Sequence, residues 1–176
     1  MIGLLHKGLL GIATWPLVCL LFLAFIVCFQ LFDWRRQKLG SETKVLDASF
    51  WYNPSDAKQF FEKIGEKGRT LYASTELSVD LVFPLVYGTL FAIFIVRVFS
   101  AEWAKWLVLV PLVTTATDLI ENSILAYMAW SYTGQASSVT WIAAVFTSVK
   151  SLCFAASLII ILVGGICGIF RGNSPV

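Results

Sequence analysis

The chain has 176 residues, of which 58% are apolar and only 14% charged, and its net charge is +2. A soluble domain typically has about 25% charged residues, so this composition excludes a soluble globular protein. The chain has no basic run long enough to bind a phosphate backbone, and nucleic acid is therefore not an expected partner. Four membrane spans of about 20 residues and one ordered loop account for the whole length, which predicts a single transmembrane domain.

The residue types that usually hold metals or haem are scarce in this chain. The four cysteines all lie in apolar segments, nine or more residues apart, and form no C-x-x-C pair: Cys19, Cys28, Cys153 and Cys167. His6 is the only histidine. We therefore expect no metal site and no cofactor.

The first apolar run, residues 8–32, is long enough to cross a membrane and too long for the apolar part of a signal peptide. We therefore expect a retained membrane span. Pro16 lies inside this run and is expected to kink the helix, which neighbouring helices in a bundle tolerate.

A polar segment, residues 33–76, separates the first span from the second. Asn53, Pro54 and Asp56 stand in the order typical of a helix start, with a capping side chain, a proline and then an acid. Apolar residues follow at helical spacing, which predicts a short amphipathic helix over about 54–64 that ends near Gly65. Its apolar face should cover the ends of the spans or lie at the membrane interface.

Three further apolar runs predict spans over about 77–97, 106–130 and 139–165. A tight turn joins the second span to the third, which makes them antiparallel neighbours. Gly164 and Gly168 form a G-x-x-x-G pattern, which favours close packing either inside the bundle or with a partner helix. The predicted fold is all-α, an integral membrane four-helix bundle with a short amphipathic helix in its first loop.

The basic residues near the span ends give conflicting signals about orientation. Arg35 and Arg36 directly follow the first span and favour a cytoplasmic polar loop, whereas Arg97, Lys105 and Arg171 favour the opposite arrangement. Because the link between the third and fourth spans carries no charge, we expect both termini in the cytoplasm.

Ionisable and polar side chains recur at helical spacing inside three of the predicted spans. They are Asp80 and Tyr87 in the second span, Asp118, Glu121 and Asn122 in the third, and Lys150 in the fourth. Counted at 1.5 Å per residue from the loop side, Lys150 lies at the depth of Asp118 and Glu121. A charge at mid-bilayer costs at least ~2.5 kcal/mol, so we predict that these six residues form one ligand-binding site inside the bundle.

The simplest structural role for Lys150 is an ion pair with Asp118 or Glu121 that holds two helices in register. Such a pair leaves two of the three intramembrane carboxylates without a cation. Buried carboxylates in that situation take up protons or find a positive charge. Arg69 or another loop base, a ligand amine or a metal ion could supply it.

The second span also carries a resemblance to a known family. The stretch Glu76–Tyr87 has an acid upstream of Pro84 and Tyr87, and so resembles the corresponding helix of the EXPERA group, which includes the emopamil-binding sterol isomerases and the sigma-two receptor. The four-span plan and the polar segment after the first span are similar to the receptor branch. The resemblance implies an intramembrane pocket for a sterol-like or amine-bearing hydrophobic molecule, with Asp33, Glu76 or Asp80 as acids.

The polar loop carries a second resemblance. Its Gly-x-x-Gly-Arg-x-x-Tyr pattern consists of Gly65, Gly68, Arg69 and Tyr72. In this pattern the chain resembles a group of small, uncharacterised bacterial four-span membrane proteins. That resemblance implies a place in a bacterial inner membrane.

Three functions stay open at this point. The first is a carboxylate-rich intramembrane pocket that binds, and in one version isomerises, a lipid-like or sterol-like hydrophobic molecule, so that enzymatic activity is undecided. The second is a non-catalytic accessory subunit of a larger membrane complex, with Lys150 in a structural ion pair with Asp118 or Glu121. The third, ion or proton translocation, is less favoured because four helices alone rarely enclose a path.

Overall fold

The computed structural model describes residues 8–40, 42–135 and 137–172, and within these ranges the only regular elements are helices. Four helical stretches are long and apolar enough to cross a membrane: Trp15–Leu39, Pro54–Val98, Ala101–Trp130 and Val139–Cys167. The predicted all-α membrane bundle is therefore confirmed.

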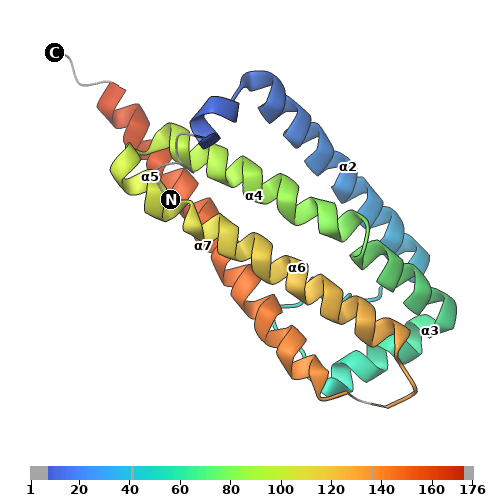
Figure 1. Ribbon diagram of the computed structural model, residues 1–176. Helices are drawn as coiled ribbons and strands as arrows, with labels where there is room; N and C mark the ends of the chain where they lie inside the picture. The colour runs from blue at the N-terminus through green and yellow to red at the C-terminus, as the bar shows by residue number, and fades with distance from the viewer. Residues whose placement is uncertain (1–7, 41, 136, 173–176) are drawn as a thin grey trace.

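The bundle is built around one central helix (Figure 1). Helix α4 (Val79–Val98) packs against α2 (Trp15–Leu39), α6 (Leu109–Trp130) and α7 (Val139–Gly172). Helix α2 packs mainly on α4, while α6 and α7 share the most extensive contact in the molecule. The first part of α3 (Pro54–Glu76) crosses the ends of α6 and α7.

Helix α2 differs from the predicted first span at both ends. It begins at Trp15 with Pro16 in its first turn, so the proline starts the helix and does not kink it. A proline suits this position because its missing N–H would have no partner there. The helix continues beyond residue 32 to Leu39, and the added turns carry the buried side chain of Arg35.

Helix α3 starts as predicted, with Asn53 as its cap. The Asn53 side chain accepts hydrogen bonds from the backbone of Ser55 and Asp56, and the Asp56 carboxylate accepts one from the backbone of Asn53. Gly65 has φ +66° and ψ −177°, a backbone conformation that breaks the helix at the predicted stop. A second helical part, not predicted, then runs on to Glu76.

The apolar stripe of the first part of α3 covers the loop end of the bundle. Ala57, Phe60 and Phe61 are buried in one core cluster with Leu125 and Ala129 of α6. Of the two positions left open by the sequence, the helix thus lies over the span ends.

The link between α4 and α6 is longer and more ordered than the predicted tight turn. It contains the short helix α5 (Ala101–Leu107), whose exposed Trp103 and Trp106 lie at the same end of the bundle as Trp15. Exposed tryptophans also mark the opposite end: Trp51, Trp130 and Trp141. Tryptophan is enriched at membrane–water interfaces, so the two groups are consistent with a bilayer between them.

Gly164 makes a close contact inside the chain. A Cβ atom at Gly164 would lie 2.5 Å from side-chain atoms of both Val98 and Phe99 at the end of α4. The other glycine of the pattern, Gly168, lies beyond the part of α7 whose side chains are described. Gly164 therefore allows α7 to approach α4 closely.

Candidate ligand-binding site

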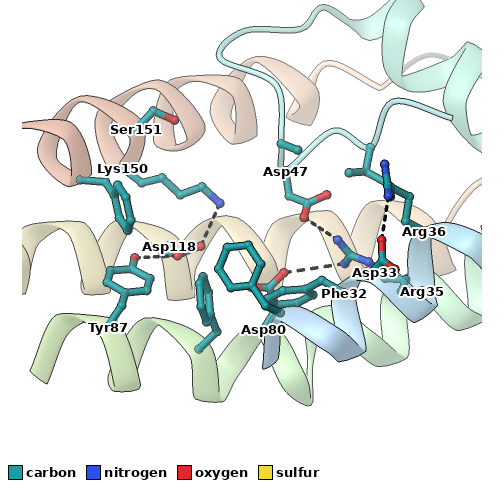
Figure 2. A pocket seen from close by; sticks show the side chains of 15 residues that line it. Phe32, Asp33, Arg35, Arg36, Asp47, Asp80, Tyr87, Asp118, Lys150 and Ser151 are labelled. Atoms are coloured by element: carbon teal, nitrogen blue, oxygen red, sulfur yellow. Dashed lines mark hydrogen bonds and ion pairs between the residues drawn. The ribbon is translucent and has the colours of Figure 1, made fainter. Parts of the chain in front are cut away.

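A cavity of about 580 Å³ lies between α2, α4, α6 and α7 and the segment 42–53 (Figure 2). Five aromatic side chains line it: Phe29 and Phe32 from α2, Phe83 and Tyr87 from α4, and Phe154 from α7. The remaining lining is largely ionisable, and apart from the pair Asp33–Arg36 its charged side chains belong to two ion clusters.

The first group, here called the Arg35 cluster, consists of Arg35, Asp47, Glu76 and Asp80. One nitrogen of the guanidinium lies 2.7 Å from Asp47 Oδ2, and the other lies 2.7 Å from Glu76 Oε1 and 3.7 Å from Asp80 Oδ2. The Tyr72 hydroxyl donates a hydrogen bond to Asp47 Oδ1 at 3.1 Å. The cluster thus joins α2, the segment 42–53, α3 and α4 through one cation. Figure 2 shows Arg35 between Asp47 and Asp80.

The second group, here called the Lys150 cluster, consists of Lys150, Asp118 and Glu121. Lys150 Nζ lies 2.9 Å from Asp118 Oδ1 and 2.7 Å from Glu121 Oε2. Tyr87 donates a hydrogen bond to Asp118 Oδ2 at 2.7 Å, and Thr147 donates one to Glu121 Oε1 at 2.6 Å. The predicted ion pair of Lys150 therefore exists with both acids, and it joins α7 to α6.

The segment 42–53 lies over the loop end of the cavity and is tied to both clusters. Burial acts to raise the pKa of Asp47, but the charges of Arg35 and Lys150 outweigh it and hold the pKa below its usual value. The Tyr52 hydroxyl lies 3.0 Å from Thr147 Oγ1, and burial raises its pKa. Asp47 is thus held as an anion, while Tyr52 keeps its proton.

Asp80 is held in place through the backbone of α4. Pro84 has no N–H, so the carbonyl of Asp80 lacks the hydrogen bond that it would otherwise receive within the helix. The side-chain amide of Asn122 on α6 donates to this carbonyl instead, at 2.5 Å. Pro84 and Asn122 together therefore position the turn of α4 that carries Asp80.

The glycines and arginine of the predicted Gly-x-x-Gly-Arg-x-x-Tyr pattern have structural roles near the site. Gly65 breaks α3, and a Cβ at Gly68 would lie 2.7 Å from Ile64 Cβ. Arg69 donates a hydrogen bond to the carbonyl of Phe61 at 3.1 Å, which links the two parts of α3 across the break. Arg69 is thus not the base that neutralises the intramembrane acids; Arg35 is the second cation.

The charges around the cavity do not balance within the described residues. Five carboxylates are buried or nearly so: Asp47, Glu76, Asp80, Asp118 and Glu121. Two bases, Arg35 and Lys150, pair with them, which leaves a formal excess of three negative charges. Such an excess in a low-dielectric region favours bound protons or a bound cation.

Asp80 is the acid with the fewest partners. It lines the cavity and is 4% exposed. Its carboxylate lies 3.7 Å from the Arg35 guanidinium, and no side chain in the described ranges donates a hydrogen bond to it. Asp80 therefore has acceptor capacity to spare for a molecule in the cavity.

Four of the six predicted site residues line the cavity: Asp80, Tyr87, Asp118 and Lys150. Glu121 is fully buried beside Lys150, and Asn122 bonds the backbone of α4, so neither belongs to the lining. The sequence interpretation missed Arg35 and Asp47. A signal for Arg35 was available, because it follows Phe32 and precedes Leu39 at helical spacing on the inward face of α2.

No protein-family model, curated protein or solved structure matches this chain. The resemblances to the EXPERA group and to the small bacterial four-span proteins therefore stay predictions. The function of this membrane protein is inferred from its cavity and the charges around it.

Proposed function

We propose that this protein binds a lipid-like or sterol-like hydrophobic molecule in the cavity, with the polar end of the ligand near Asp80 and Asp118. One observation carries the proposal: aromatic side chains and members of both ion clusters line the same space of about 580 Å³. Small-molecule sites typically have volumes of roughly 300–1,000 Å³, a mostly apolar lining and a few converging polar groups.

The charge of the lining favours a ligand whose polar end is a cation or a hydrogen-bond donor. The acids around the cavity outnumber the bases, and Asp80 has no hydrogen-bond donor among the described side chains. A protonated amine would reduce the excess negative charge and donate to Asp80. The rings of Phe83 and Tyr87 would add cation–π attraction, because both line the same space.

The experiment is the recovery of a co-purifying ligand from matched variants. The protein is extracted with its native lipids into nanodiscs, and bound molecules are measured by mass spectrometry. Asp80→Asn should weaken retention by removing the carboxylate that has acceptor capacity to spare, and Phe154→Trp should do so by filling the cavity. Leu152→Trp is the control, because Leu152 lies on the exposed face of α7.

Equal retention by all these variants, with similar unfolding temperatures, would overturn the proposal. If the protein also isomerises its ligand, a proton must move between the ligand and a carboxyl group. Incubation in deuterated water should then place deuterium in the recovered ligand, and Asp80→Asn should prevent it.

The accessory-subunit alternative is supported by a different observation. Lys150 joins α7 to α6 through two acids, as a purely structural ion pair would. Gly164 packs on Val98 and Phe99 of its own chain, so a partner helix would have to meet a surface of the bundle other than the one at Gly164. Purification in a mild detergent separates the two functions, because a discrete larger assembly favours the subunit.

A further inference from the structure

A second hollow adjoins the cavity on the outer side of α2. This groove has a volume of about 320 Å³ and is lined by Phe25, Ile26, Phe29, Gln30 and Asp33. Phe29 and Asp33 also line the cavity, so the two spaces meet at these residues. The groove and the cavity are therefore adjacent, with the side chains of Phe29 and Asp33 common to both.

The groove leads from the polar end of the cavity into the apolar part of α2. Asp33 and Gln30 lie nearer the loop end, and Phe29, Ile26 and Phe25 follow toward the middle of the span. Ile26 is 40% exposed and Phe29 55% exposed, on a helix that faces the bilayer. The groove is thus open to the hydrocarbon region of the membrane.

Aromatic rings of α2 and α4 pack together where the two spaces adjoin. The ring of Phe83 on α4 lies 5.3 Å from that of Phe25, 5.7 Å from that of Phe29 and 5.2 Å from that of Phe32, measured between centroids. Among the side chains that line the groove only Asp33, at its loop end, is charged, so a hydrocarbon chain that passes Phe29 toward Phe25 moves away from that charge.

We infer that the ligand is a lipid with a long hydrocarbon chain, whose polar end lies in the cavity and whose chain leaves past Phe29 and lies in the groove of α2. This inference rests on the proposed function and makes it narrower, because a compact sterol-like molecule would fill the cavity and leave the groove to bulk lipid. The chain exchanges one apolar environment for another, since lipid tails are as apolar as the groove. The specific attraction comes from the polar end, and the groove selects for the chain by its shape.

The test uses two photoreactive forms of an unbranched long-chain alkylamine. One carries a diazirine next to the amine and the other carries it near the far end of the chain. Each is added to the protein in phosphatidylcholine nanodiscs, with and without an excess of unlabelled alkylamine. Mass spectrometry of peptides then locates the label that the unlabelled amine suppresses, which separates specific binding from contact with bulk lipid.

The expected result is that the two probes label different parts of the site. The probe with its diazirine near the amine should label peptides that contain Asp80 or Asp118, and the far-end probe should label the peptide that spans Phe25 to Gln30. Ile26→Trp should remove the suppressible far-end label by filling the groove. Leu23→Trp should leave it, because Leu23 is exposed on α2 but does not line the groove.

Two other results would overturn the inference in distinguishable ways. If both probes label only cavity peptides, the chain does not use the groove, and the proposed function stands without this inference. If the unlabelled amine suppresses the label of neither probe, the cavity does not hold an amine-bearing lipid. In that case the inference fails together with the amine form of the proposed function.

Discussion

The two ion clusters differ in how many parts of the chain each one joins. Arg35 binds acids from three other segments, whereas Lys150 binds two acids that lie three residues apart on the single helix α6. A guanidinium is a planar fork that can donate to two carboxylates at once, while an ammonium is a compact point charge. The Arg35 cluster therefore fixes the tertiary arrangement around the cavity, and the Lys150 cluster supplements a helix contact that packing already secures.

The largest expected effect is that of removing Arg35. Arg35→Met leaves Asp47, Glu76 and Asp80 buried without their cation, and breaking a buried ion pair in this way costs about 3–5 kcal/mol. Arg35→Lys should recover part of this loss, since an ammonium cannot reach both acids with the same geometry. Thermal unfolding in detergent measures both changes.

The neighbouring Arg36 provides a matched control for Arg35. It pairs with Asp33 at 2.7 Å, but both side chains are about half exposed. Exposed pairs contribute roughly 0–1 kcal/mol, so Arg36→Met should be nearly neutral. If Arg35→Met and Arg36→Met unfold alike, the Arg35 cluster does not hold the four segments together.

A smaller effect is expected at the Lys150 cluster. Lys150→Met leaves two buried acids without their cation, whereas Arg35→Met leaves three. Tyr87 and Thr147 still donate hydrogen bonds to the two acids near Lys150. In a double-mutant cycle with Asp118→Asn, the pair should show a coupling of about 0.5–3 kcal/mol. If the pair is purely structural, the double variant should regain stability and also keep the ligand. If the pair belongs to the ligand site, the double variant should regain stability but lose the ligand.

The same contrast explains which half of the site could be predicted from the sequence. Asp118, Glu121 and Lys150 stand out because each is a charge within a long apolar run, and helix geometry then fixes their relative depth. Arg35 and Asp47 lie in the polar segment, where charges are ordinary. Their burial depends on two features of the tertiary structure: α2 continues beyond the apolar run, and the segment 42–53 folds back over the bundle.

The helices themselves could be predicted because apolar runs of span length leave few alternatives. The ends of the helices were harder to predict. Pro16 fits the first turn of a helix as well as a kink, and only the packed structure distinguishes these roles. The hydrogen bond from Asn122 to the backbone of Asp80 could not be predicted either, because it depends on how α6 is aligned with α4 and not on residue type.

That hydrogen bond provides a third prediction, which tests whether the position of Asp80 depends on α6. Asn122→Leu leaves the carbonyl of Asp80 without a donor, and an unsatisfied buried acceptor costs about 1–3 kcal/mol. Pro84→Ala restores the N–H that would satisfy this carbonyl within α4. The cost of Asn122→Leu should therefore be smaller in the Pro84→Ala background, as measured by thermal unfolding. The same cost in both backgrounds would mean that Asn122 acts through other contacts.

The smallest expected effect concerns acid pH and the segment 42–53, which connects the two clusters. The folded protein holds the pKa of Asp47 below its usual value, and the unfolded value is about 3.9. The resulting stabilisation is present above the unfolded pKa and is lost as the pH falls through the folded pKa. The difference in unfolding temperature between the unsubstituted protein and Asp47→Asn should therefore be constant near neutral pH and shrink below about pH 4. Asp47→Ser offers a second comparison, since it also lacks the charge but cannot replace the carboxyl group as an acceptor from both Arg35 and Tyr72. The contrary result is a difference in unfolding temperature between the unsubstituted protein and Asp47→Asn that stays the same in acid. In that case the ionised form of Asp47 does not contribute to stability, and the segment is held by Tyr52 and its neighbours alone.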